Sequence, residues 1–257
     1  MIDERHEHPH HGGGRGHAHA RHAAGSAGPP AAFERAQTDG SRSGLDIGRM
    51  VECAISIADA EGLVALSMRR VARELGRPAV MSLYRHVRSK DDLIDLMLDQ
   101  VLGEAAVVSA ADQGWRVTLH DGAIARRATM LRHPWAIEAS AGRALLGPHS
   151  LGQMERTLEA LDGVGITPDL AFSIFGCVDA YTMGSVADDI ARQGTWERHV
   201  AAAERSRPDI SEAIATGAYP ALARFVAGHR HPSSDERFQF GLERLLDGVA
   251  TLLERAG

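Results

Sequence analysis

From Leu45 onward, apolar side chains recur every three or four residues, which is the spacing of one face of an α-helix. No stretch of useful length alternates apolar and polar side chains as a half-buried strand does. The pattern therefore predicts an all-α protein. Glycines and prolines interrupt residues 193–233, so short helices and loops are expected there. The longer helices are expected at about 47–61, 68–75, 79–86, 90–102, 115–131, 148–161, 168–192 and 235–255.

Residues 1–44 differ in composition from the rest of the chain. They are poor in apolar side chains, rich in Gly and Pro, and contain seven of the fourteen histidines. Such a segment buries too little apolar surface to offset its conformational entropy, so a disordered tail is predicted. Dense imidazoles bind nickel, copper or zinc weakly, but no ligand spacing marks a metal site, and none is predicted. The remainder is predicted to form two domains, 45–104 and 105–257.

The segment 67–90 carries seven basic side chains and one acidic side chain, although the whole chain has a formal net charge of -6. This local excess suits a polyanionic partner, and a solvated helical surface is the alternative. Ser67 and Ser89 are placed to cap the helices that follow them, and Gly76 suits a tight turn. A helix, a glycine turn and a short helix together form a helix-turn-helix arrangement.

In a helix-turn-helix, the second helix enters the major groove of DNA while the first lies against the phosphates. The second helix would present Val80, Met81, Ser82 and Arg85 to base edges. Tyr84 and His86 would contact phosphates or pack between helices. The side chains expected to neutralise phosphates are Arg69, Arg70, Arg73, Arg77 and Lys90.

Four short sequences, in this order, resemble the DNA-binding domain of the tetracycline-repressor (TetR) family. They are Leu66-Ser67-Met68-Arg69-Arg70-Val71-Ala72, Leu75-Gly76, Ser82-Leu83-Tyr84-Arg85-His86-Val87 and Lys90-Asp91-Asp92-Leu93. The resemblance covers about residues 45–104. It implies a DNA-binding head of three helices and a fourth helix leading to an all-helical body. It assigns DNA contacts to Ser67, Arg69, Val80, Met81, Ser82, Tyr84, Arg85, His86 and Lys90. Between Gly76 and Tyr84 this chain has one residue more than the family usually has.

The second half of the chain resembles the subgroup nearest to the tetracycline repressor itself. The matching residues are Trp115, Arg132-His133-Pro134-Trp135, Gly165-Ile166-Thr167-Pro168, Phe238-Gln239-Phe240-Gly241-Leu242 and Leu245-Leu246-Asp247-Gly248. The resemblance implies a homodimer in which the helices at about 168–192 and 235–255 of two copies pair. The apolar stripe of the last helix is wider than one packing partner requires, which also indicates a dimer interface.

A pocket for a small-molecule effector is predicted between helices of the body. The alternative is that these aromatic and methionine side chains are ordinary core. Asp179 lies on an otherwise apolar face, so it is expected to pair with an arginine, bind a cationic ligand or lie in the dimer interface. Residues 136–140 contain no histidine that would match the one that helps to hold drug-bound magnesium in the tetracycline repressor, so tetracycline is not predicted. The candidate ligand residues are Trp135, Phe172, Phe175, Asp179, Tyr181, Met183 and Trp196.

These observations predict a ligand-responsive, cytoplasmic repressor that binds a near-palindromic operator in double-stranded DNA. A metal-handling protein that works through its histidine-rich tail is a second interpretation. An enzyme is a third, but the sequence has no nucleophile elbow, phosphate loop, zinc-protease motif or paired carboxylates. No cofactor is predicted. The chain has no run of eighteen apolar residues, so no membrane span is predicted.

Overall fold

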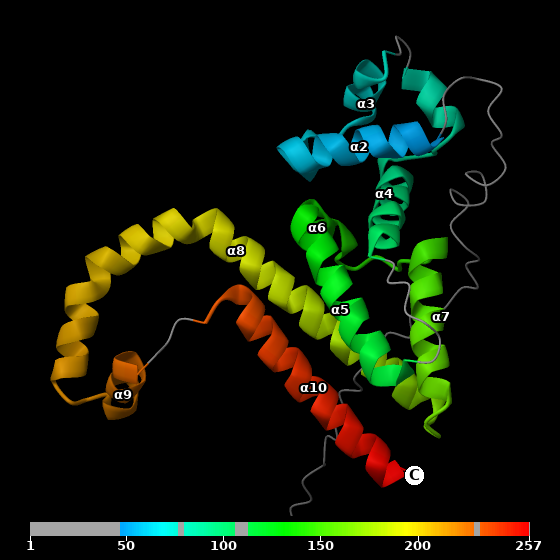
Figure 1. Cartoon of the computed structure of the whole chain (residues 1–257). Helices are drawn as coiled ribbons and strands as arrows, with labels where there is room; N and C mark the ends of the chain where they lie inside the picture. Colours follow the sequence, from blue (N-terminus) through cyan, green and yellow to red (C-terminus); the bar gives the residue numbers. More distant parts are fainter. Residues whose placement is uncertain (1–46, 77–79, 106–112, 229–231, 257) are drawn as a thin grey trace, which may run out of the picture.

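A computed structural model shows the chain as an assembly of helices (Figure 1). Every regular element among the described residues is a helix, as the sequence predicts. The predicted disordered tail, 1–44, lies outside the described residues. Between 194 and 211, and at 213, only the backbone is described. The described residues are 47–76, 80–105, 113–228 and 232–256.

The head of the molecule consists of residues 47–105 and lies at one end in Figure 1. The helix α2 packs against α3 and α4, and α3 packs against η2. The head elements are α2 (Ile47–Glu61), η1 (Leu63–Ala65), α3 (Met68–Glu74), η2 (Val80–Arg85) and α4 (Lys90–Glu104).

Polar caps begin the head helices where the sequence predicts them. The Ser67 hydroxyl oxygen accepts a hydrogen bond from the Arg70 amide at 3.2 Å, and the Ser89 hydroxyl oxygen accepts one from the Asp92 amide at 3.0 Å. Each bond satisfies an amide that has no partner within its own helix. Gly76 follows α3 with φ +64°, a left-handed conformation that glycine adopts without steric cost. These caps and this turn determine where α3 and α4 begin and how the chain leaves α3.

The short helix after the turn differs in type from the α-helix expected at 79–86. Residues Val80–Arg85 form a 3₁₀-helix, and residues 77–79 lie outside the described part of the chain. The amides of His86 and Val87 both bond to the Leu83 carbonyl, at 2.9 and 3.1 Å, so three-residue and four-residue spacings mix at its end. A segment of six residues is too short to favour the α-helical ladder strongly, and tight 3₁₀ turns are common in such connections.

The body consists of residues 113–256, and α5 is its central helix. It packs against α7, α8 and α10, while α6 joins the body to α4. The Thr167 hydroxyl caps α8. Pro168 occupies the first turn of this helix, where proline is favoured. The body elements are α5 (Gly114–Arg132), α6 (Trp135–Ser140), α7 (Pro148–Asp162), α8 (Pro168–Ala215), α9 (Pro220–Gly228) and α10 (Ser234–Ala256).

The helix α8 is much longer than predicted. It runs through Gly194 and Pro208 to Ala215 and curves away from the body in Figure 1, although loops and short helices were expected from 193. One glycine costs a helix only about 1 kcal/mol relative to alanine, and the neighbouring Ala, Glu and Arg residues favour helix. The prediction of loops before Ala215 is therefore wrong. The short helix α9 follows and buries none of its side chains.

Two hydrophobic cores hold the structure together. The head core contains four side chains that are 0% exposed, namely Met50, Val71, Leu83 and Met97. Trp135 of α6 packs against the same cluster. The second core joins α5, α7, α8 and α10 through residues such as Leu119, Leu161, Val178, Phe238 and Leu242. Because the head core includes side chains of α6, the head and the body are packed together rather than joined by a free linker.

Candidate DNA-binding head and ligand pocket

Three arginines of the head are exposed around the glycine turn. Arg69 and Arg73 lie on α3, and Arg85 ends η2. Within the described residues none of the three forms an ion pair, so their guanidinium groups face solvent with their full charge. Ser67, directly before α3, is also exposed. A cationic helix beginning at an exposed cap is suited to contact phosphate oxygens.

The short helix η2 presents one face outward and one face inward. Met81 is 72% exposed and Tyr84 is 43% exposed, and with Arg85 they form the outer face. Leu83 is 0% exposed and anchors the inner face in the head core. Ser82 is half-buried between the two faces. The outer face therefore offers a cation, a phenol and a flexible apolar side chain to a partner, which suits contacts with bases and phosphates.

Two other predicted contacts of η2 lie deeper than expected. His86 is only 7% exposed, because it follows η2 at the point where the chain turns back towards the core. Val80 is half-buried and packs against the head core. The structure does not favour direct DNA contacts by these two side chains. Packing between helices, the alternative role considered for His86, agrees better with its burial.

Arg70 and Lys90 make contacts within the head. Arg70 forms ion pairs with Glu61 of α2 at 2.7 Å and with Glu74 of α3 at 3.0 Å. Its charge is therefore compensated, and the side chain connects α2 to α3. The Lys90 ammonium group donates a hydrogen bond to the Leu63 carbonyl at 3.4 Å and remains half-buried. Arg70 is thus a weaker candidate for a phosphate contact than Arg69, Arg73 or Arg85.

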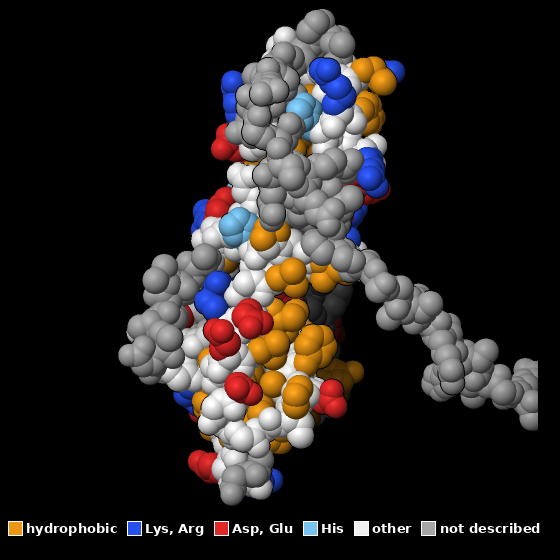
Figure 2. All heavy atoms as spheres, turned by 90° about the vertical axis from the view of Figure 1, so that its right-hand side faces the viewer, with side chains coloured by type: hydrophobic (Ala, Val, Ile, Leu, Met, Phe, Trp, Pro, Cys, Tyr) orange, Lys and Arg blue, Asp and Glu red, His pale blue; other side chains and the backbone are white. Residues whose placement is uncertain are grey.

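The charged side chains are divided between the two ends of the molecule. Figure 2 shows most of the Lys and Arg side chains of this face at the head end and most of the Asp and Glu side chains on the body. The sequence counts agree, since residues 67–90 contain seven basic side chains and one acidic side chain. A polyanion would therefore be attracted to the head and repelled by the body.

A polar cluster joins the head to the body. The Asp59 carboxylate of α2 accepts hydrogen bonds from Trp135 Nε1 and from His133 Nδ1, both at 2.7 Å. The other ring nitrogen of His133 lies 3.2 Å from Glu104 of α4, and Arg132 lies 2.8 Å from the same carboxylate. Burial raises the pKa of Glu104, but the hydrogen bonds from Arg132 and His133 outweigh it and leave that pKa below its ordinary value.

A second contact ties α4 to the beginning of α7. Asp99 of α4 is 4% exposed, and its carboxylate accepts hydrogen bonds from the Ser150 amide and hydroxyl, each at 3.0 Å, and from the His149 amide at 3.3 Å. A carboxylate of one helix thus caps the first turn of another. Arg143, in the preceding loop, also reaches α4, at 2.8 Å from Asp95. Movement of α7 would therefore be transmitted to α4.

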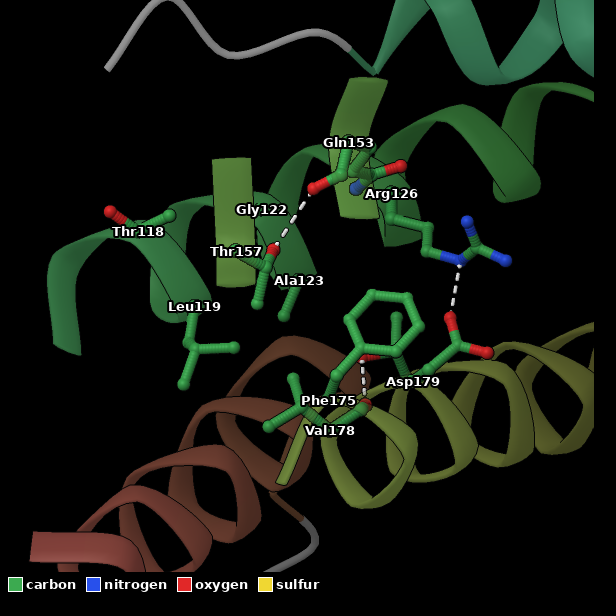
Figure 3. A pocket seen from close by; sticks show the side chains of 11 residues that line it. Thr118, Leu119, Gly122, Ala123, Arg126, Gln153, Thr157, Phe175, Val178 and Asp179 are labelled. Carbon is green, nitrogen blue, oxygen red and sulfur yellow. Dashed lines mark hydrogen bonds and ion pairs between the residues drawn. The ribbon is translucent and has the colours of Figure 1, made fainter. Parts of the chain in front are cut away.

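A narrow pocket lies between α5, α7 and α8 (Figure 3). Arg126 of α5 and Asp179 of α8 form an ion pair of 2.8 Å at one end, and the Phe175 ring lies near the centre. The cavity volume is about 30 Å³, which is room for one or two water molecules. A larger ligand would need the helices or Phe175 to move. The other lining residues are Thr118, Leu119, Gly122, Ala123, Gln153, Thr157, Val178 and Thr182.

The chain resembles known transcriptional regulators over most of its length. Residues 109–253 match the family described as "Tetracyclin repressor-like, C-terminal domain". The HTH-type transcriptional repressor DrrR1 of Streptomyces coeruleorubidus is 38% identical over 225 residues, which are 85% of this chain and 82% of DrrR1. The chain belongs to the TetR family. Its members are transcriptional regulators, so the predicted family, the all-helical fold and the class of function are confirmed.

Solved structures of other TetR-family proteins have the same fold. ActR of Streptomyces coelicolor in complex with actinorhodin has a TM-score of 0.71 and 32% identity, and the match covers 81% of this chain and 96% of ActR. BioQ with its double-stranded DNA operator has a TM-score of 0.56 and 23% identity, covering 80% of this chain and 99% of BioQ. At that identity the likeness to BioQ shows the fold alone. This chain is thus a TetR-family regulator with a helix-turn-helix head and a helical body.

The structure brings together only two of the residues predicted to bind an effector. Phe175 and Asp179 line the pocket. Trp135 instead lies in the joint between head and body, where its indole binds Asp59. Phe172 is 58% exposed on α8, outside the pocket. These two residues therefore do not line this pocket.

The remaining predicted ligand residues have other positions. Tyr181 stacks on Phe238 with a centroid distance of 5.5 Å, and its hydroxyl donates a hydrogen bond to the Phe238 carbonyl at 2.9 Å. Met183 packs against the head core. Trp196 lies in α8, and its side chain is outside the described part of the structure. For Tyr181 and Met183, the alternative that such side chains are ordinary packing residues agrees with these positions.

The polar half of the pocket is not evident from the sequence. Nothing in the local sequence distinguishes Arg126 from its neighbour Arg127. Gln153 and Thr157 lie four residues apart on one side of α7, and both face α5. The one available signal was the carboxylate of Asp179 on an apolar face, for which pairing with an arginine was one of three expected roles. That partner is Arg126.

Proposed function

We propose that this TetR-family regulator is a homodimeric repressor that a small-molecule effector releases from its operator. The observation that carries the DNA-binding part is the set of exposed, unpaired arginines around the glycine turn, among the described residues of α3 and η2. They lie on a head that is closely packed, so they would meet DNA in a fixed arrangement. The contacts proposed on this surface are Ser67, Arg69, Arg73, Met81, Ser82, Tyr84 and Arg85, with Lys90 beside them.

The surface of α8 supports the homodimer. The stretch Pro168–Gln193 is long enough and apolar enough to cross a membrane by length and composition, yet only 28% of it is buried within the chain. Cys177 is exposed on this stretch, and Phe240 of α10 is 66% exposed. A second copy packed on α8 and α10 would bury this apolar surface, whose exposure to water is unfavourable.

The pocket between α5, α7 and α8 is the proposed effector site. In a related protein, ActR, the bound ligand is actinorhodin, so a relative of this chain binds a small molecule. Gln153 and Thr157 of α7 line the pocket here, and Asp99 of α4 holds the first turn of α7. An effector that separates α5 from α7 would therefore shift α4 and change the spacing of the two heads.

A gel-shift assay with the DNA upstream of the protein's own gene tests the DNA-binding part. The wild-type protein should retard this DNA at moderate salt. The Arg85→Ala variant should bind about 10-fold or more weakly, because a contact between arginine and a base is worth about 1–3 kcal/mol. The matched control is Arg224→Ala, an exposed arginine of the body helix α9, which should bind like the wild type. Equal binding by both variants, or no specific retardation by the wild type, would refute the proposal.

A further inference from the structure

The ion pair at the end of the pocket is incompletely satisfied. The Arg126 side chain is 11% exposed, and its Nε lies 2.8 Å from Asp179 Oδ1. That oxygen does not lie along the direction of the Nε–H bond, so among the described residues this buried nitrogen has no hydrogen-bond acceptor. The two terminal amino groups of Arg126 likewise have no acceptor in the described part of the chain. Several hydrogen-bond donors are thus available beside the cavity.

Asp179 supplies the complementary group. It is 32% exposed, and only its Oδ1 atom approaches Arg126, which leaves Oδ2 without a donor within the described structure. Figure 3 shows the two side chains meeting at one end of the pocket, with Leu119 towards the other end. One end of the pocket therefore presents a donor and an acceptor side by side, and the rest is largely apolar.

The charges of Arg126 and Asp179 determine which net charge of a ligand the pocket favours. Arg126 and Asp179 are the two ionisable side chains among the residues that line the pocket, and they compensate each other. A carboxylate would meet Asp179 at close range, and an amine would meet Arg126. Like charges in a site of low dielectric repel strongly, and an unpaired buried charge is costly. A ligand without net charge avoids both penalties.

The hydroxyls of the pocket limit the ligand further. The Thr157 hydroxyl donates a hydrogen bond to the backbone carbonyl of Gln153 at 3.1 Å, and the Thr182 hydroxyl donates one to the backbone carbonyl of Val178 at 2.8 Å. Both oxygens therefore remain as acceptors for a ligand donor. The pocket is therefore best suited to a molecule that donates hydrogen bonds to these oxygens and accepts hydrogen bonds from Arg126.

We propose that the effector is an uncharged, mainly apolar ring compound whose polar end carries a hydrogen-bond acceptor and a hydrogen-bond donor next to each other. The acceptor binds the amino groups of Arg126, and the donor binds the free oxygen of Asp179. Because the cavity holds only about 30 Å³, binding requires Phe175 or the helices to move, and the ring system then lies against the apolar residues of α5 and α8. This inference rests on the proposed effector site, and it specifies the ligand class of that site.

Three matched probes test the ligand class with the full-length protein. The amide 2-naphthamide has both an acceptor and a donor, methyl 2-naphthyl ketone lacks the donor, and 2-naphthoate lacks the donor and carries a negative charge. Their dissociation constants can be measured by ligand-observed NMR titration. The amide should bind about 10-fold more tightly than either of the others, because a hydrogen bond to a charged group is worth about 1.5–3 kcal/mol. Absent binding, or equal or tighter binding of the ketone or the carboxylate, would overturn the inference.

A charge-neutralising variant makes the test specific to this pair. In Asp179→Asn the charge of Arg126 is no longer compensated, so the order should reverse and 2-naphthoate should bind more tightly than 2-naphthamide. The matched control is Asp188→Asn, an exposed aspartate of α8 that pairs with Arg192 outside the pocket. It should keep the wild-type order. An unchanged order in Asp179→Asn would overturn the role of the pair.

Gel shifts with the same proteins separate this inference from the proposed function. Without a probe, the wild-type protein should retard the operator DNA, because the proposed DNA contacts lie in the head and not in the pocket. If the wild type binds the probes in the expected order but does not bind DNA, the repressor proposal fails and the ligand class stands. If it binds DNA but not the amide, the ligand class fails alone.

Discussion

At the scale of single residues, the head depends on a few side chains that are fully enclosed. Leu83 is 0% exposed, whereas its neighbour Met81 is 72% exposed. The same short helix therefore has one residue that anchors it and one that faces a partner. The sequence pattern predicted this outer face, but it placed Val80 and His86 there as well. Their burial follows from how η2 and the residue after it pack against α3 and the head core, which helical spacing alone does not determine.

Substitutions at these two positions should separate stability from DNA binding. Leu83→Ala should lower the free energy of unfolding by about 2–5 kcal/mol, because it opens a cavity in the head core. Met81→Ala should change it by less than about 0.5 kcal/mol, since the side chain is exposed, but should weaken operator binding. Urea unfolding and fluorescence anisotropy with labelled operator measure the two quantities. A stable Leu83→Ala protein would show that η2 is not anchored as described.

The joint between head and body should be sensitive to acid through Glu104. Its pKa is lowered in the folded protein, so its contribution to stability is complete above the ordinary value of 4.5 and is lost as the pH falls from there through the folded pKa. Thermal unfolding of wild type and Glu104→Gln should therefore differ most near neutral pH and converge below that value. A difference that stays constant from neutral pH to acid would contradict this role.

At the scale of elements, the caps could be predicted from sequence and the contacts between helices could not. Ser67, Ser89 and Pro168 act within a few residues of their own position, so local sequence contains the information. Asp99 acts on α7, about fifty residues later, and Arg126 acts on Asp179 of another helix. Such pairs depend on how the helices pack. Periodicity shows which face of a helix is apolar, but not which residues of another helix that face meets. The length of α8 was missed for a different reason, because single Gly and Pro residues were given too much weight.

The cap between α4 and α7 can be tested by two substitutions at one contact. A Cβ atom added at Gly147 would collide with the Asp99 carboxylate, so Gly147→Ala should destabilise the protein. Asp99→Ala should cost about 0.5–2 kcal/mol, because the first turn of α7 loses its cap. The double variant should lose less stability than the sum of the two single losses, since the collision disappears with the carboxylate. Strict additivity in urea unfolding would show that the two residues do not share this contact.

At the scale of the whole molecule, a cationic head and an acidic body are joined by α4, and a two-fold axis relates the two copies of the dimer. The head binds DNA, the body pairs with a second copy, and the contacts of Asp59 and Asp99 connect the two. The sequence predicted this division because the distribution of charge and the order of the motifs can be determined without knowing how the helices pack. It indicated only part of the proposed effector pocket, because the pocket forms where three helices pack together, and local sequence does not determine that packing.

The central claim is that two heads of one dimer bind successive grooves of duplex DNA. Hydroxyl-radical footprinting of the operator bound by the full-length protein tests it most directly. The account predicts two protected half-sites related by two-fold symmetry, with centres about 10 base pairs or a multiple of that apart. A single protected half-site, or protection spread evenly along the DNA without symmetry, would contradict it.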